Sequence, residues 1–207
     1  MTTKSKGISR IKLGLEVVKV RLDGTPLEEP RTFECNSWLK QWADILSTMM
    51  GSGASGDSTA GVVDTGGTGR TVEQAATGLA SEGPRMNAAA GDETLGVQLG
   101  TGVTAVDRDD NALVALIAEG AGAGQLNYLI QAFSLRVEIA GGFRFSLERQ
   151  VNNNSGGTIT VQEIGLVTLH RIAGPSTALF LILRDLVTEA IPTTESRIFR
   201  YHMDFLA

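Results

Sequence analysis

The chain of 207 residues has a single cysteine, Cys35, and only two histidines, His170 and His202. One cysteine cannot form a disulfide within the chain, which excludes a disulfide-stabilised scaffold and indicates a reducing compartment. The sequence also has few thiol and imidazole groups that could bind a metal, and they are not clustered at ligand spacing. We therefore expect no metal and no cofactor.

The sequence also lacks an excess of positive charge and any long apolar run. Its 18 Lys and Arg are scattered among 23 Asp and Glu, giving a formal net charge of −5. A protein that binds the phosphates of a nucleic acid needs clustered basic residues, so we expect no nucleic-acid partner. The longest apolar stretch, residues 178–183, is far too short to cross a bilayer, and the basic start MTTKSKGISR has no apolar segment after it. We expect neither a membrane partner nor a secretory signal.

Aromatic residues make up only 5% of the chain, whereas glycine occurs 25 times, which favours thin strands and many turns. The first predicted strand runs from Ile11 to Leu22, and apolar residues alternate along it with polar ones. The alternation changes phase at Val17–Val18, which predicts either a β-bulge or a strand that crosses from one packing face to another. Phe33 and Cys35 follow a turn and predict a short return strand.

One amphipathic helix is predicted over residues 37–50. Trp38, Trp42, Ile45 and Met49 form a stripe at helical spacing. Asn36 or Ser37 would supply the N-cap and Gly51 would end the helix. The two tryptophans are expected to anchor the helix on a sheet, and the alternative is that they stack on a ligand.

Gly, Ala, Ser and Thr dominate residues 51–92, and few large apolar side chains occur there. Burial of so little apolar surface cannot offset the roughly 1–2 kcal/mol per residue that backbone ordering costs. We therefore expect an extended insertion or arm, held in place by a neighbouring subunit.

Most of the remaining chain has the alternating pattern of β-strands. A short strand is predicted at Val97–Leu99 and a short helix from Asp109 or Asp110 to Ile117, while residues 179–183 are apolar on both faces and indicate a central strand. Further strands are predicted at 133–139, 143–147, 159–166 and 199–205, with a polar turn at 152–157. Short strands with turns between them predict one domain, 1–207, that is mainly β: an antiparallel β-sandwich, jelly-roll-like.

Two short motifs raise the question of catalysis or cofactor binding. Val62 to Gly67 reads VVDTGG and resembles the active-site triplet of aspartic proteases, in which two such aspartates share a proton. One copy of Asp64 would require a homodimer, and the alternative is a turn in which Asp64 bonds its own backbone. Gly100-Thr101-Gly102 is weakly similar to a dinucleotide-binding turn, but antiparallel patterning follows where a parallel unit is needed.

The other polar residues have simpler structural explanations. Asp107, Asp109 and Asp110 suit the start of the predicted helix, and Arg184 and Asp185 are expected to satisfy each other or a neighbouring strand. The two histidines and Cys35 have no motif around them. We expect no catalytic, cofactor-binding or metal-binding residue, and no enzymatic activity.

Several segments occur together in an order typical of one group of proteins. They are Asn36-Ser37-Trp38 opening a helix, VVDTGGT, LGTG, GQLNY at 124–128, RQVNNNSGGTITVQEIGLV at 149–167, and LILRDL at 181–186. This order resembles small structural proteins of tailed bacteriophages, encoded among head, neck and tail genes. The resemblance implies a location in the virion, assembly in the bacterial host cytoplasm, and no catalysis.

The resulting hypothesis is a structural subunit of a tailed bacteriophage particle: a capsid decoration, neck, collar or tail component. Its partners would be other virion proteins and further copies of itself. Two alternatives stay open, namely a fibre module that binds host-surface carbohydrate and a dimeric aspartic protease that uses Asp64.

Overall fold

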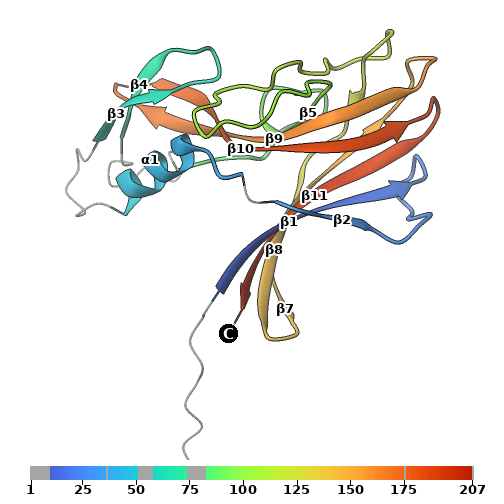
Figure 1. Cartoon of the computed structure of the whole chain (residues 1–207), viewed down its shortest axis with the longest axis horizontal. Coiled ribbons are helices and arrows are strands. Elements are labelled where there is room, and N and C mark those ends of the chain that lie inside the picture. The colour runs from blue at the N-terminus through green and yellow to red at the C-terminus, as the bar shows by residue number, and fades with distance from the viewer. Residues whose placement is uncertain (1–9, 36, 51–57, 74–82, 175, 207) are drawn as a thin grey trace, which may run out of the picture.

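The protein consists of two antiparallel β-sheets and one helix (Figure 1). The structure is a computed structural model, and it describes residues 10–35, 37–50, 58–73, 83–174 and 176–206. The six-stranded sheet contains β1 (Arg10–Val20), β2 (Arg31–Glu34), β6 (Asn127–Tyr128), β7 (Ala132–Ile139), β8 (Gly142–Asn152) and β11 (Ser196–Leu206). The five-stranded sheet contains β3 (Ser58–Val63), β4 (Gly69–Glu73), β5 (Gly96–Gly100), β9 (Ile159–Ile172) and β10 (Ser176–Ile191).

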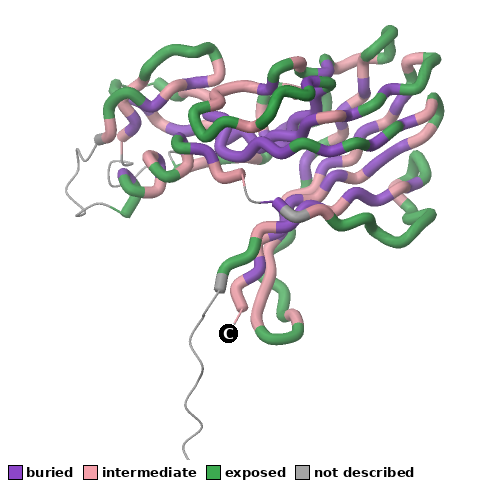
Figure 2. The backbone as a smooth tube through the Cα atoms, viewed as in Figure 1, coloured by how far each residue is buried: buried purple, intermediate pink, exposed green. Residues whose placement is uncertain are grey.

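The six-stranded sheet runs in the order β2-β1-β11-β8-β6, with β7 also pairing with β8. The five-stranded sheet runs β10-β9-β4-β3, with β5 also pairing with β9. Alternate residues of both sheets meet in one core, seen as the buried region of Figure 2, which includes Leu15, Leu99, Val151, Ile164, Phe180 and Phe199. This arrangement confirms the predicted mainly β fold, two antiparallel sheets consistent with a β-sandwich.

The helix packs against β10 and against the β3–β4 hairpin, at one end of the five-stranded sheet (Figure 1). This helix, α1 (Lys40–Met49), has Ile45 fully buried against the core. It starts later than predicted, because Trp38 bridges to Leu183 and the Leu39 N–H donates to the Ile182 carbonyl at 3.0 Å. Residues 37–39 are therefore held along β10, and Leu39 is the N-cap, without a side-chain capping bond. The predicted cap at Ser37 is wrong; Asn36 and Gly51 lie outside the described residues.

Strand β10 is apolar on both faces but lies at the end of its sheet. Its second edge is covered by residues 37–39, since the Arg184 N–H also points to the Ser37 carbonyl at 3.4 Å. The prediction of a central strand is therefore wrong in sheet position. The burial that suggested it comes instead from α1 on one side and from residues 101–117 on the other, where Leu113 packs with Leu181.

Strand β1 pairs with β11 without a break from Arg10↔Leu206 to Val20↔Ser196. The phase change at Val17–Val18 is thus not a β-bulge. Leu15 and Val17 are buried before this point and Val18 and Val20 after it, while Lys19 stays partly exposed, so burial passes from one face of the strand to the other. The second predicted explanation, a change of packing face, agrees with this register.

Part of the Gly-rich segment 51–92 belongs to the five-stranded sheet. Within it, β3 and β4 form a hairpin that is joined to β9 by the pair Val72↔Ile172. Residues 51–57 and 74–82 lie outside the described residues, so the extended insertion or arm predicted for them is not described.

No helix forms at residues 109–117. Instead the chain runs back beside β5, with an isolated bridge between Gly100 and Leu116 and a hydrogen bond from Ile117 N–H to the Leu99 carbonyl at 2.9 Å. The buried Glu163 of β9 accepts hydrogen bonds from the Val114 and Ala115 N–H groups, and Arg184 of β10 binds the Asp110 side chain. These bonds outweigh the weak helical pattern. None of the described helices is long and apolar enough to cross a membrane.

One part of the six-stranded sheet projects away from the sandwich (Figure 1). We call residues 10–14, 132–146 and 202–206 the lobe. It consists of the β7–β8 hairpin and the adjoining ends of β1 and β11, joined by the pairs Ile11↔Phe205 and Phe143↔Phe205. Figure 2 shows that most of the lobe is intermediate or exposed, in contrast to the sandwich.

Candidate interaction site

One face of the lobe and of the sheet next to it is covered by ion pairs. Arg144 donates to Asp204, its cross-strand neighbour, through Nε at 2.6 Å and through Nη2 at 2.8 Å. Glu16 lies between Arg144 and Arg200, at 3.4 Å and 2.9 Å. Arg200 also pairs with Glu148 at 2.7 Å. Opposite charges placed directly across strands stabilise a sheet, so this face is satisfied internally.

The opposite face of the lobe is apolar. Ile11, Phe205 and Phe143 lie in register across three strands, and Leu13, Met203 and Phe145 form the next row. The rings of Phe143 and Phe205 stack with centroids 5.3 Å apart, and Phe145 lies 5.8 Å from Phe205. Ile11 nevertheless remains 58% exposed, and Phe133, beside Phe145 on β7, remains 55% exposed. The lobe thus presents apolar side chains that nothing within the described chain fully covers.

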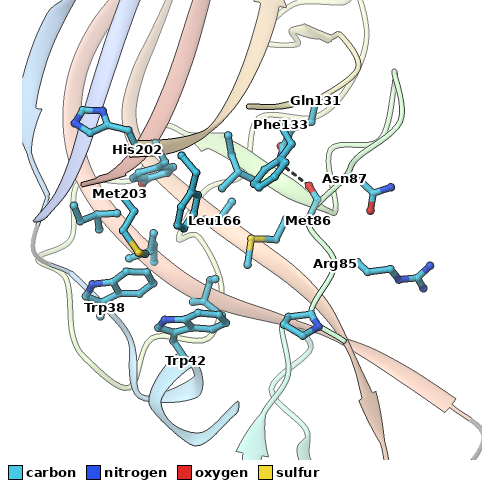
Figure 3. A pocket seen from close by; sticks show the side chains of 17 residues that line it. Trp38, Trp42, Arg85, Met86, Asn87, Gln131, Phe133, Leu166, His202 and Met203 are labelled. Atoms are coloured by element: carbon cyan, nitrogen blue, oxygen red, sulfur yellow. Dashed lines mark hydrogen bonds between the residues drawn. The ribbon is translucent and has the colours of Figure 1, made fainter. Parts of the chain in front are cut away.

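This apolar face forms one wall of a groove, and α1 with the five-stranded sheet forms the other (Figure 3). Two adjoining hollows of about 410 Å³ and 830 Å³ share Leu13, Trp38, Trp42, Phe145 and Met203. We call the two together the apolar groove. Its apolar lining includes Ile11, Leu13, Trp38, Trp42, Leu46, Met86, Phe133, Phe145, Leu147, Leu166, Ile182 and Met203.

The predicted tryptophan stripe contributes to this groove. Trp38 and Trp42 stack with centroids 5.6 Å apart at an interplanar angle of 13°, and both are only partly buried. They pack against the core, as the anchoring prediction requires, and they also line the groove. The sequence suggested anchoring or ligand stacking as alternatives, whereas the structure shows an anchored pair with accessible ring surface.

Few polar groups line the groove. Gln131 is buried and fully engaged, since its Nε2 donates to the Met86 carbonyl at 2.6 Å and its Oε1 accepts from Val97 N–H at 2.7 Å. Lys40 and Arg85 lie at its rim, both exposed. In the described part of the chain, no group of three or more His, Cys, Asp or Glu is placed to hold a metal ion. The groove therefore suits apolar side chains better than a polar small molecule.

Asp64 occupies the turn between β3 and β4. Its Oδ1 accepts hydrogen bonds from Gly66 N–H at 3.0 Å and Thr68 N–H at 2.8 Å, and its Oδ2 accepts from Arg70 Nε at 2.6 Å. Burial raises the pKa of this carboxyl, but the bonds from Thr68, Arg70 and Gly66 outweigh burial and hold the pKa below its ordinary value. This geometry matches the predicted turn, and both carboxylate oxygens are occupied by it.

The Gly100-Thr101-Gly102 turn holds a buried carboxylate. Gly102 N–H donates to Glu163 Oε1 at 3.1 Å, and Ala115 N–H donates to the same atom at 2.8 Å. A side chain at Gly100 or Gly102 would overlap Glu163. The turn follows an antiparallel strand, β5 paired with β9, so the parallel unit of a dinucleotide site is missing here.

The RQVNNNSGGTITVQEIGLV segment and LILRDL meet at one buried ion pair. Glu163 belongs to the first and Arg184 to the second; Arg184 Nε donates to Glu163 Oε2 at 2.9 Å, and both side chains are 0% exposed. Gly165 leaves room for Leu181 and Leu113. Asn153 is also fully buried and donates to the Gly157 and Ile191 carbonyls, at 2.7 Å and 2.6 Å. The most specific part of the resemblance thus consists of residues with structural contacts.

Arg184 and Asp185 do not pair with each other as one prediction had it. Arg184 also binds Asp110 at 2.7 Å, whereas Asp185 accepts a hydrogen bond from the Tyr201 hydroxyl at 3.2 Å. Both therefore have partners on other segments, which was the other predicted possibility. Asp110, expected to start a helix, instead accepts a hydrogen bond from Arg184.

Cys35 is buried, and burial together with Asp185 raises the pKa of its thiol, which keeps it protonated.

The two histidines lie apart and are both buried. His170, on β9, has no described hydrogen-bond partner for either ring nitrogen, and burial lowers its pKa. His202, on β11, lies on the charged face, with Nδ1 3.8 Å from Glu16. Burial and the Arg144 charge lower the pKa of His202, so the neutral form is favoured. His202 and Cys35 line one hollow beside β1, whereas no described contact places His170 beside Cys35, Asp64 or His202.

The apolar groove is the feature that sequence reasoning missed. Alternation identified the apolar face of each strand, but not which part of that face the rest of the chain covers. Comparison of the chain with protein-family models, with curated proteins and with solved structures found no match in any of the three.

Proposed function

We propose that this chain is a non-catalytic structural subunit of a tailed bacteriophage particle, a capsid decoration, neck, collar or tail component that acts by packing against other proteins. One observation carries the proposal: an aromatic-rich apolar groove and lobe face stay open while the opposite face of the lobe is satisfied by ion pairs. Large open apolar surfaces of this kind mark sites of association with another protein.

The sequence resemblance supports the same role. Asn153, Glu163, Gly165 and Arg184 all belong to the phage-like segments, and all are used to hold the fold together rather than to form an open polar site. Virion location and bacterial host cytoplasm as the place of assembly are part of the proposal. Its partners would be other virion proteins and further copies of the chain.

The carbohydrate-binding alternative gains one observation, the stacked Trp38–Trp42 pair with accessible ring surface. Sugars also need several polar partners, and the groove supplies few, because Gln131 is already engaged. A glycan array probed with the purified chain tests this alternative, and a silent array removes it.

The main test is quantitative mass spectrometry of purified particles of the phage that encodes the chain. A copy number comparable to that of the shell protein makes the chain a decoration subunit, and a small copy number makes it a neck, collar or tail component. Absence from the particles overturns the proposal.

A matched pair of variants tests the groove. Phe133→Asp places a charge in the groove, whereas Val103→Asp places one at an equally accessible site outside it; the two side chains are 55% and 65% exposed. We expect the Phe133 variant to be depleted from particles at least tenfold and the Val103 variant to be incorporated normally. Equal incorporation of both contradicts a role for the groove.

A further inference from the structure

The tip of the β1–β2 hairpin, residues 21–30, combines exposed leucines with acidic side chains. Leu22 is 56% exposed and Leu27 is 46% exposed, and three carboxylates lie in the same loop. These are Asp23, Glu28 and Glu29, against one cation in the loop, Arg21; Glu28 also pairs with Lys19 at 3.7 Å. We call this segment the acidic loop.

The acidic loop has a defined shape. Gly24 N–H donates to the Arg21 carbonyl and Arg21 N–H donates to the Thr25 carbonyl, both at 2.9 Å. Leu27 N–H donates to the Lys19 carbonyl, also at 2.9 Å. Figure 2 shows the loop as an exposed end of the sandwich. A preorganised tip loses little conformational entropy when it binds, which favours its use in a contact.

The charge at the rim of the apolar groove is opposite to that of the loop. Lys40 and Arg85 are exposed there, and Arg108 is 83% exposed, with an ion pair to the adjacent Asp109 at 3.5 Å. No carboxylate is among the described residues that line the groove. A basic rim on a chain with net charge −5 is a local departure from the overall balance.

We propose that the acidic loop of one copy binds in the apolar groove of a second copy, with Leu22 and Leu27 in the hollow. The carboxylates of Glu28 and Glu29 then face Lys40 and Arg85. This inference rests on the proposed function and names a second copy of the chain as one partner of the groove.

A loop cannot reach the groove of its own copy. Ile11 and Leu13 line the groove near one end of β1, and the loop follows the other end of that 11-residue strand. At about 3.3 Å per residue the strand separates the two by roughly 30 Å. Figure 1 likewise places the loop at the far side of the sandwich from α1. The contact is therefore between copies.

The contact joins two different surfaces, so each copy offers one loop and one groove. Such a head-to-tail arrangement closes into a ring or continues as a filament. Two copies that each place their loop in the other's groove instead close as a two-fold dimer.

Charge reversal tests the contact with little risk to the fold, because all four side chains are exposed. One variant carries Glu28→Lys and Glu29→Lys, another carries Lys40→Glu and Arg85→Glu, and a third carries all four changes. Glu138→Lys, at an 85% exposed side chain outside both surfaces, is the control. The mass of the full chain is measured by sedimentation velocity at about 100 mM salt, where exposed charges still interact within about 10 Å.

Wild type and the control are expected to associate into dimers or larger oligomers. Each two-site reversal should lower the association constant at least tenfold, and the four-site variant should recover it. The inference is overturned by a monomeric wild type, by normal assembly of both two-site variants, or by failure of the four-site variant to recover association.

Particle mass spectrometry separates the two proposals. A chain that is present in particles but monomeric alone contradicts only this inference, and a chain that self-assembles but is absent from particles contradicts only the proposed function.

Discussion

Arg184 on β10 and Glu163 on β9 form an ion pair whose two side chains are completely buried, with Arg184 Nε 2.9 Å from Glu163 Oε2. The carboxylate also accepts N–H groups from Gly102, Val114 and Ala115. One pair of charges therefore fixes the path of residues 101–117, which cover the outer face of the five-stranded sheet.

Replacing Arg184 with Met should lower the free energy of unfolding by about 3–5 kcal/mol, because Glu163 would stay buried with an uncompensated charge. Urea unfolding followed by tryptophan fluorescence measures the change. Lys19→Met is the control, since Lys19 forms surface pairs with Glu28 and Glu195 and should cost no more than about 1 kcal/mol. If the two changes lowered the free energy of unfolding equally, the buried ion pair would stabilise the fold no more than the surface pairs do.

Gly14 is required because the His202 imidazole lies against its Cα, where any side chain would overlap the ring. Gly14→Ala should cost about 1–3 kcal/mol through overpacking. The cost should shrink when His202→Ala is also present, because the clash is then gone. A double-mutant cycle in urea gives this coupling. Gly157→Ala, where nothing lies within 4 Å, is the matched control, and a coupling of zero would contradict the packing argument.

Acid should destabilise the protein through its histidines. The pKa values of His170 and His202 are both lowered in the fold, mainly by burial, so the unfolded chain binds more protons. The stability that the neutral rings contribute is complete above the unfolded pKa of about 6.5 and is lost as pH falls through the lower folded values. The melting temperature, measured from pH 8 to pH 4, should therefore decrease as the pH is lowered below about 6.5.

His170→Leu should reduce this acid dependence and hold or raise the stability near pH 7, because it removes a buried ring without a described hydrogen-bond partner. An unchanged pH profile in this variant would show that His170 does not take part.

Asp64→Ala should cost about 1–2 kcal/mol, since Gly66 and Thr68 N–H groups and Arg70 would lose their acceptor. Asp23→Ala, which removes a similar bond to Thr25 in an exposed turn, should cost less. Thermal unfolding compares the two. The same Asp64 variant tests the protease alternative, because wild-type particle maturation in its presence rules that activity out.

Alternation of apolar and polar residues was a reliable guide to the long strands of the six-stranded sheet, including β7, which is exposed almost throughout. The apolar residues Phe133, Phe143 and Phe205 predicted strands β7, β8 and β11, and the structure contains all three. Alternation could not give the strand order. It therefore could not reveal that Phe133 and Ile11 would end up on a lobe that the second sheet does not reach.

Other predictions failed where a distant residue decides the local structure. Residues 109–117 have a weak helical pattern, yet Glu163, far along the chain, binds the Val114 and Ala115 N–H groups and holds this segment in a non-helical path. The helix was likewise expected to begin at Ser37, but pairing with β10 delays it to Lys40. Hairpin β3–β4 was missed because its apolar side chains are few, and its position depends on β9.

The pairing of β1 with β11 has a consequence for biosynthesis. Arg10 pairs with Leu206, so β1 must wait for its neighbour β11 until that strand has been synthesised. At about 5–20 residues per second that interval is roughly ten to forty seconds. During it, β1 can pair with β2 but lacks β11, so the six-stranded sheet and the core beneath it can close only once β11 has been synthesised.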